Sequence, residues 1–223
     1  MQFLGGTRAV APLLLGTAPF GVIYGVLAIQ SGLPVLLAQA MSLIVFAGSA
    51  QFIAAPLIGA GASGLVIVLT TFIVNLRHAL YSASLAPHLR ELPSAWKWLL
   101  SYLLVDEAYA VAIRHYQEHS ATPNRHWYFL GAGLALWVTW QLTTAIGIFL
   151  GAEVPAEWGL DFTLALTFIA IVVPMLGDRA SVAAALAAGL TAVAGFALPY
   201  KLGLILAAFA GIATGMLLEA RSR

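Results

Sequence analysis

The sequence predicts an all-α integral membrane protein of about eight transmembrane helices, with seven as the alternative count. Of its 223 residues 61% are hydrophobic and 9% are charged, whereas a soluble domain carries about 25% charged residues. The mean hydropathy is +0.95. So few charged residues cannot cover the surface of a globular protein in water, so most of the outer surface of the chain must face lipid. Strands of a membrane β-barrel would alternate apolar and polar residues, and no such alternation appears.

The apolar runs have the length of membrane-spanning helices. A bilayer core about 30 Å thick requires about 20 mostly apolar residues per helix. The longest polar stretch, His115–Trp127, is too short to fold alone, so residues 1–223 are expected to form a single transmembrane permease domain. The eight predicted spans are Val10–Gln30, Pro34–Ile58, Gly64–Leu85, Trp96–Ile113, Tyr128–Leu150, Phe162–Leu176, Ser181–Leu198 and Leu202–Leu218.

Lysine and arginine in the loops predict the orientation, because positive charge is kept on the cytoplasmic side of a membrane. Eight spans place six arginines on the side of the N-terminus and three cations on the other side. Both termini are therefore expected in the cytoplasm. The first group is Arg8, Arg114, Arg125, Arg179, Arg221 and Arg223, and the second is Arg90, Lys97 and Lys201.

The third span carries the densest set of polar residues within an apolar run. Each ionised group at mid-bilayer costs roughly 2.5–3.5 kcal/mol, so Arg77, near the middle of the span, needs a partner. Asp106 and Glu107 lie at a similar depth in the fourth span, and we expect Arg77 to pair with one of them. At about 100° per residue the polar residues of the third span form one broad face. This face comprises Thr70, Thr71, Asn75, Arg77, His78, Tyr81, Ser82 and Ser84.

This charged group has two interpretations. A buried salt bridge between Arg77 and Asp106 could serve only to hold the bundle together. One arginine facing two carboxylates and a histidine exceeds what such a pair requires, however, and a spare carboxylate in a low-dielectric site could carry a proton. Asp106, Glu107 and His78 are therefore the candidates for proton coupling.

Helices one and two are predicted to be interrupted, near Gly16–Pro19 and Gly48–Gln51. A proline within a helix frees a carbonyl, and Ser49 is expected to cap the second half-helix of its span. Half-helix N-termini bind anionic groups, and unwound carbonyls bind cations. Non-helical backbone at this depth is tolerated only inside protein or beside a wet cavity. Both stretches are therefore either glycine packing points or borders of a transport path.

Small and hydroxyl-bearing residues elsewhere predict helix contacts. The pairs Gly21/Gly25 and Gly211/Gly215 have the spacing that lets two helices approach closely. The polar residues of the fifth span either satisfy their own helix or line a cavity. They are Thr139, Gln141, Thr143 and Thr144.

The sequence lacks the motifs that would indicate other functional classes. The chain has no cysteine, no His-Glu-x-x-His or Gly-x-Ser-x-Gly string and no Gly-x-x-x-x-Gly-Lys loop. We therefore predict no catalytic residue, metal site or cofactor, and expect neither an enzyme nor a nucleic-acid-binding protein. The alternatives are a passive channel for small solutes and an intramembrane enzyme.

Three strings in the N-terminal half resemble a known family. They are Ser42-Leu-Ile-Val-Phe-Ala-Gly-Ser-Ala-Gln-Phe52, Asn75-Leu-Arg77 followed by Leu80-Tyr81, and Leu104-Val-Asp106-Glu107. Their order and spacing are similar to those of the large subunit of AzlC-type branched-chain amino acid exporters, the LIV-E family. The resemblance implies a secondary-transporter subunit in the bacterial inner membrane that works with a small AzlD-type subunit. The implied substrates are valine, leucine and isoleucine, with methionine as a further candidate.

The implied substrate fits the polar residues of the chain. An amino acid needs a positive site for its carboxylate, a negative or carbonyl site for its ammonium, and an apolar pocket for its side chain. We predict that half-helix N-termini and Arg77 bind the carboxylate. Asp106 or Glu107 binds the ammonium, and phenylalanine rings form the apolar pocket. Transport without a nucleotide site suggests proton coupling. The predicted substrate-binding residues are Pro19, Phe20, Gly48, Ser49, Gln51, Asn75, Arg77 and Asp106.

Overall fold

The computed structural model describes residues 1–119, 123–151, 176, 178–199 and 202–222. This part of the chain contains helices and no strand, which confirms the all-α class for the described residues. Its contacts divide it into two units, residues 1–158 and 159–223, which are described separately. A single permease domain therefore stays a prediction. The predicted sixth span, Phe162–Leu176, lies outside the described residues except for its last one.

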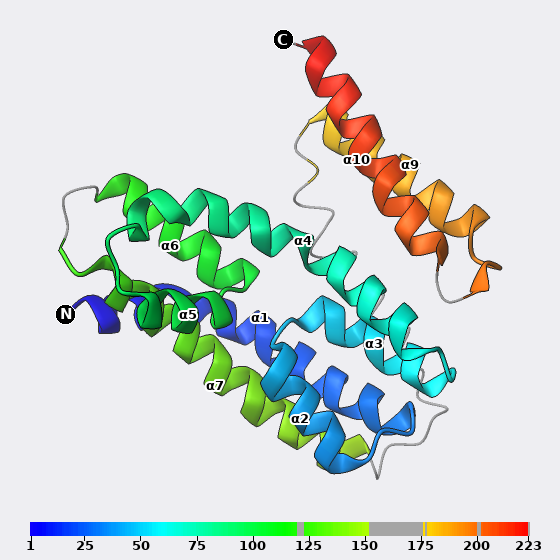
Figure 1. The fold of residues 1–223 in the computed structure, drawn as a ribbon, viewed down its shortest axis with the longest axis horizontal. Helices are drawn as coiled ribbons and strands as arrows, with labels where there is room; N and C mark the ends of the chain where they lie inside the picture. The colour runs from blue at the N-terminus through cyan, green and yellow to red at the C-terminus, as the bar shows by residue number, and fades with distance from the viewer. Residues whose placement is uncertain (120–122, 152–175, 177, 200–201, 223) are drawn as a thin grey trace. The chain divides into compact units, whose positions relative to one another are not determined.

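Three long helices form the frame of the first unit (Figure 1). They are α1 (Gln2–Gln30), α4 (Gly64–Leu89) and α7 (Arg125–Gly151). Each is long and apolar enough to cross a bilayer. They correspond to the predicted first, third and fifth spans, although α1 begins at Gln2 where the sequence predicted Val10.

The helices α1 and α7 lie side by side and run in the same direction. A Cβ atom built on Gly6 would lie 1.9 Å from the Tyr128 carbonyl oxygen, and one built on Gly25 would lie 2.4 Å from that of Thr144. Only glycine permits two backbones to approach this closely. The predicted contact through Gly21 and Gly25 is therefore confirmed, with α7 as the partner helix.

The predicted interruption of the first helix near Gly16–Pro19 is wrong, because α1 is unbroken and contains Pro19 within it. The Thr17 hydroxyl donates to the Leu13 carbonyl at 3.0 Å, and Pro19 is exposed on the outer side of the helix. A proline is tolerated in a membrane helix where neighbouring helices and hydroxyl side chains hold the backbone. Here the close contact with α7 on both sides of the proline holds α1 in one piece.

The second predicted span, Pro34–Ile58, is a re-entrant hairpin and does not cross the unit. It consists of α2 (Val35–Val45) and α3 (Gly48–Gly59), so the predicted interruption near Gly48–Gln51 is confirmed. The helix α2 starts shortly after Ser31, and a Cβ on Gly59 at the end of α3 would lie 2.8 Å from the Ser31 carbonyl oxygen. The hairpin therefore begins and ends at the same end of the bundle, where α4 also starts (Figure 1).

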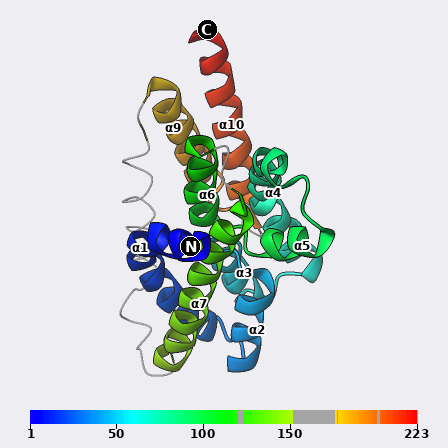
Figure 2. The ribbon, with the colours of Figure 1, turned by 90° about the vertical axis from the view of Figure 1, so that its left-hand side faces the viewer.

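The fourth predicted span, Trp96–Ile113, is also a re-entrant hairpin, and it starts from the opposite end of the bundle. It consists of α5 (Ser94–Tyr102) and α6 (Asp106–Glu118). Near the start of α5 the Trp96 ring packs on Trp127, with centroids 5.0 Å apart. Near the end of α6 the Tyr116 hydroxyl donates to the Arg125 carbonyl at 2.9 Å. Both outer ends thus lie at the start of α7, on the side of the N-terminus (Figure 2).

Because both hairpins turn back instead of crossing, the lysines and arginines near the helix ends of this unit lie at one end of the bundle. We define the basic face as the end that holds the start of α1, the end of α4, the outer ends of α5 and α6, and the start of α7. The neutral face is the opposite end, with residues 31–34 and 60–63, and it has no lysine or arginine. This corrects the predicted distribution, which separated Arg90 and Lys97 from the other cations. The basic face carries Arg8, Arg90, Lys97, Arg114 and Arg125.

The second unit contains a helix pair. It consists of α9 (Arg179–Ala194) and α10 (Leu202–Ser222). The predicted contact through Gly211 and Gly215 is confirmed, because Cβ atoms built on them would lie 3.2 Å and 3.4 Å from atoms of Ala184. Asp178 caps α9 by accepting a hydrogen bond from the Ser181 backbone N–H at 2.7 Å, and this bond lowers the pKa of the Asp178 carboxyl. The helix α10 is long and apolar enough to cross a bilayer.

Candidate functional site

The tips of the two hairpins meet at Arg77, which lies halfway along α4. Its Nη1 is 2.7 Å from Asp106 Oδ2, in the first turn of α6. Its Nη2 donates to Ser49 Oγ, in the first turn of α3, at 2.6 Å. One side chain thus joins the N-termini of two half-helices. The predicted pairing of Arg77 with a carboxylate of the fourth predicted span is confirmed.

Two residues form the first break. Phe46 has φ 37° and ψ 49°, in the left-handed region, and ends α2. Ala47 is extended and occupies the cap position before α3. The expected capping role of Ser49 is therefore wrong, and its hydroxyl accepts from Arg77 instead. Ser49 meets Arg77 because the first turn of α3 faces α4 at this depth.

Side chains from α5 and α7 donate to carbonyls in the last turn of α2, beside the first break. The Tyr102 hydroxyl donates to the Leu43 carbonyl, and Gln141 Nε2 donates to the Ser42 carbonyl at 3.3 Å. The Ser42 hydroxyl donates to Thr144 Oγ1, also at 3.3 Å. Non-helical backbone at membrane depth needs such partners. Of the polar residues in the fifth predicted span, Gln141 and Thr144 therefore support the break.

The second break was not predicted, because its tip is apolar. Leu103 caps α5, Val105 is extended, and α6 begins with Asp106 and Glu107. Carboxylates in a first turn favour a helix N-terminus, and this acidic pair is the signal that could have located the break. Leu103 is buried against Gly133 of α7, where an added Cβ would lie 2.9 Å from the leucine Cβ.

Asp106 is held by tyrosine as well as by Arg77. The Tyr81 hydroxyl donates to Asp106 Oδ1 at 2.7 Å, so both carboxylate oxygens have a donor. The Tyr81 ring stacks on that of Tyr109, with centroids 4.4 Å apart and planes at 12°. The Tyr109 hydroxyl in turn donates to Ser84 Oγ at 3.0 Å. This row of side chains binds α6 along the predicted polar face of α4.

The cluster around the ion pair is only partly enclosed. The side chains of Arg77 and Asp106 are 33% and 40% exposed, so the pair is not sealed in a dry core. Three buried polar atoms on α4 lack a hydrogen-bond partner among the described residues: Asn75 Oδ1, Arg77 Nε and His78 Nε2. Such atoms cost free energy unless water or a ligand meets them. The arrangement therefore favours a site that a polar molecule occupies.

The remaining predicted site residues lie elsewhere. Gln51 is fully buried on the opposite side of α3 from Ser49, and its Oε1 accepts from Trp140 Nε1 at 3.1 Å. Gly48 contacts the same tryptophan. The Phe20 ring lies 6.3 Å from that of Phe52, and Pro19 faces outward. The predicted residues that the structure gathers at the hairpin tips are Ser49, Asn75, Arg77, His78, Asp106 and Glu107.

The part of the chain with both hairpins matches a known family. The model of the AzlC protein family covers residues 12–154, which is more than half of the 223 residues. The chain belongs to the AzlC family. It is therefore a membrane protein with a transport role, as the three strings around Ser42, Asn75 and Asp106 implied.

Individual relatives of this AzlC-family chain cover most of its length. It is 28% identical over 223 residues to the inner membrane protein YgaZ of Escherichia coli, covering 96% of this chain and 88% of the relative. It is 30% identical over 205 residues to an uncharacterized membrane protein of Archaeoglobus fulgidus, with shares of 90% and 88%. It is 27% identical over 161 residues to the branched-chain amino acid transport protein AzlC of Bacillus subtilis, with shares of 72% and 62%. No solved structure matches the chain.

Proposed function

We propose that the chain is the large subunit of a secondary transporter that exports branched-chain and similar apolar amino acids across the bacterial inner membrane. Membership of the AzlC family and the similarity to the Bacillus subtilis transport protein support this role. The observation that carries the proposal is the half-exposed pair of Arg77 and Asp106 between two half-helix N-termini. A cation and an anion side by side at mid-membrane suit a zwitterion.

Each part of an amino acid has a group to meet in this cluster. The carboxylate binds Arg77 and the free N–H groups in the first turn of α3, where the helix dipole is positive. The ammonium binds Asp106. The side chain of valine, leucine, isoleucine or methionine packs toward the rings of Phe46 and Tyr102, whose centroids lie 6.0 Å apart at the first break.

Competition for Arg77 provides the coupling to protons. A substrate carboxylate that binds Arg77 separates Asp106 from this arginine, and Asp106 can take a proton once the substrate ammonium has left it. Glu107 follows Asp106 in the first turn of α6, and His78 has a buried Nε2 without a partner among the described residues. These two side chains are the other candidate proton carriers.

The distribution of cations supports one orientation. We place the basic face in the cytoplasm, because that end holds every lysine and arginine of the first unit other than Arg77. The N-terminus is then cytoplasmic, and we keep the C-terminus on the same side. A small AzlD-type subunit is the proposed partner in the membrane.

Efflux of radiolabelled valine from cells that express the chain with its small partner tests the proposal. We expect uphill export that a protonophore abolishes and that is lost without the partner. Asp106→Asn and Arg77→Ala should abolish export at normal expression. Glu118→Gln should not, because it removes only the exposed pair with Arg114, at 2.9 Å.

Two outcomes would contradict this function. Efflux that runs only down the gradient and ignores the protonophore would indicate a passive channel. Export that stays at the parental rate in both Asp106→Asn and Arg77→Ala would show that the ion pair is a structural bridge.

A further inference from the structure

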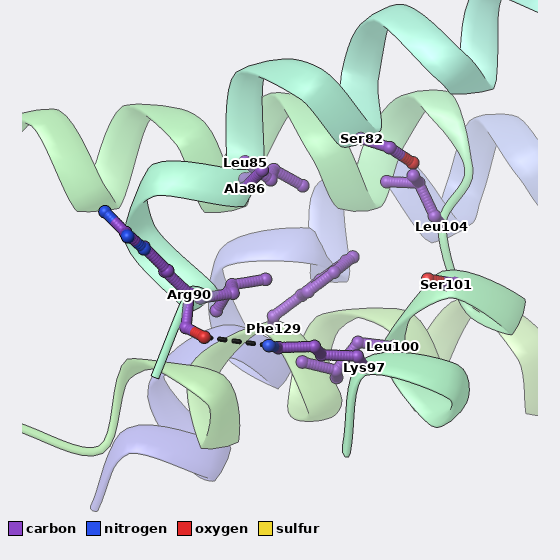
Figure 3. A pocket seen from close by; sticks show the side chains of 10 residues that line it. Ser82, Leu85, Ala86, Arg90, Lys97, Leu100, Ser101, Leu104 and Phe129 are labelled. Carbon is purple, nitrogen blue, oxygen red and sulfur yellow. Dashed lines mark hydrogen bonds between the residues drawn. The ribbon is translucent and has the colours of Figure 1, made fainter. Parts of the chain in front are cut away.

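A pocket of about 340 Å³ lies between α4, α5 and α7, on the basic-face side of the Arg77 cluster (Figure 3). Pockets that hold small molecules measure about 300–1,000 Å³, so this one has room for a single small solute. Apolar side chains form most of its wall, among them Leu85, Leu100 and Phe129. Its outer rim holds Arg90 and Lys97.

The rim of the pocket carries uncompensated positive charge. Lys97 Nζ donates to the Arg90 carbonyl at 2.8 Å, which holds the ammonium at the rim (Figure 3). No carboxylate lines the pocket, and neither cation belongs to an ion pair among the described residues. An anionic group bound at this rim would have the Lys97 ammonium beside it and an apolar wall beneath it, while the Arg90 guanidinium is directed away from the other lining side chains (Figure 3).

The inner end of the pocket adjoins the ion pair. Ser82 and Leu104 line this end. Ser82 follows Tyr81, the hydroxyl donor to Asp106, and Leu104 lies two residues before Asp106 in the tip of the second hairpin. The elements that close the pocket on the inside are therefore the ones that carry the Arg77 cluster.

We propose that this pocket is the cytoplasmic loading site of the transporter, with the substrate carboxylate at Lys97 and its apolar side chain against Leu85, Leu100 and Phe129. The inference rests on the proposed function and assigns the recognition of different substrate groups to two places in the protein. The loading site recognises the carboxylate and the side chain, whereas Asp106 at the hairpin tips recognises the ammonium. A 2-oxo acid with the same side chain therefore fits the pocket, and an amino alcohol does not.

Uptake of radiolabelled leucine into inside-out membrane vesicles, which expose the cytoplasmic face, tests the loading site. We expect 4-methyl-2-oxopentanoate to compete with leucine and leucinol to have no effect. Lys97→Gln should raise the half-saturating leucine concentration by about tenfold, as for the loss of one charge-assisted hydrogen bond. It should weaken inhibition by the oxo acid equally and leave the maximal rate unchanged. Arg114→Gln, which removes a basic-face cation outside the pocket, should match the parent.

Each part of the proposal can fail separately. If the oxo acid does not compete, or competes equally in the parent and in Lys97→Gln, the loading site is wrong, while leucine uptake that is lost in Asp106→Asn keeps the proposed function. A parent that takes up no leucine overturns both. In proteoliposomes of phosphatidylcholine alone the effect of Lys97→Gln should persist. An effect that appears only with phosphatidylglycerol would show that the pocket holds a lipid headgroup instead.

Discussion

The two re-entrant hairpins share an architecture and differ in their chemistry. Residues 35–59, which form the α2–α3 hairpin, contain no charged side chain. Amide and hydroxyl groups of α7 hold this hairpin. The α5–α6 hairpin is held to α4 by an ion pair and two tyrosines. Its charged residues are Lys97, Asp106, Glu107, Arg114 and Glu118.

This difference indicates which hairpin responds to a substrate. A charged solute gains little by replacing one partner of a neutral hydrogen bond, whereas it can take the place of either partner of an ion pair. The α2–α3 hairpin is therefore a fixed wall of the site, and the α5–α6 hairpin is the part that a zwitterion can release. Arg77 contacts both and is the joint between them.

The largest expected effect concerns the two bonds of Arg77. Its coupling to Asp106 should exceed its coupling to Ser49, because the charged guanidinium donates to both side chains but only the carboxylate adds an opposite charge. A hydrogen bond to a charged group contributes about 1.5–3 kcal/mol. The side chains of Arg77 and Asp106 are 33% and 40% exposed, so the coupling free energy between them should lie near the lower limit of this range. Double-mutant cycles of Asp106→Ala and Ser49→Ala with Arg77→Ala, followed by unfolding in detergent, measure both couplings. Equal values would remove the distinction between the hairpins.

A second effect should be confined to the fixed wall. Gln141→Leu leaves the amide of Gln39 without a partner and removes one of the two donors to the Ser42 carbonyl, which keeps the Phe46 backbone N–H. A lost partner in a buried site costs about 1–3 kcal/mol of unfolding free energy. The half-saturating leucine concentration of the folded protein should stay unchanged. The control is Thr143→Val, whose hydroxyl bonds only within α7. A Gln141→Leu protein as stable as this control would contradict the assigned support.

The smallest effect concerns the tyrosines beside Asp106. Tyr81→Phe removes one donor from the carboxylate and should lower the initial transport rate by about fivefold, roughly 1 kcal/mol, because water can partly replace the hydroxyl. Tyr109→Phe removes a bond to Ser84 and should leave the rate nearly unchanged. If both variants lose the same activity, Tyr81 acts through packing and not through Asp106.

Charge in an apolar run was a reliable guide to the site. Arg77 and Asp106 could be paired from the sequence because neither can face lipid without a partner. The first break could be located because Gly48, Ser49 and Gln51 interrupt an apolar run. The second break has only apolar residues at its tip, Leu103 to Val105, and gives no such interruption.

The path of the chain could not be read from composition. A run of 25 mostly apolar residues such as 34–58 is long enough to cross a bilayer, and the contact of Gly59 with Ser31 that accompanies its return is a tertiary feature. Pro19 failed as a predictor for the same reason, since packing against α7 decides whether α1 breaks. The lack of any lysine or arginine between Arg8 and Arg77 is a sequence feature that fits a hairpin of residues 35–59 better than a crossing, because a crossing would place the connection 60–63 in the cytoplasm without a cation.

Cysteine labelling tests the re-entrant paths most directly, because the parent chain has no cysteine. A membrane-impermeant maleimide is added to intact cells that express Ser31→Cys, Ser63→Cys, Ser94→Cys or Glu118→Cys. Two hairpins that meet at Arg77 predict labelling of the first two variants and protection of the last two until the cells are opened. Labelling of Ser31→Cys and Ser94→Cys with protection of Ser63→Cys and Glu118→Cys would show that both segments cross the membrane, and would contradict the structure of the site.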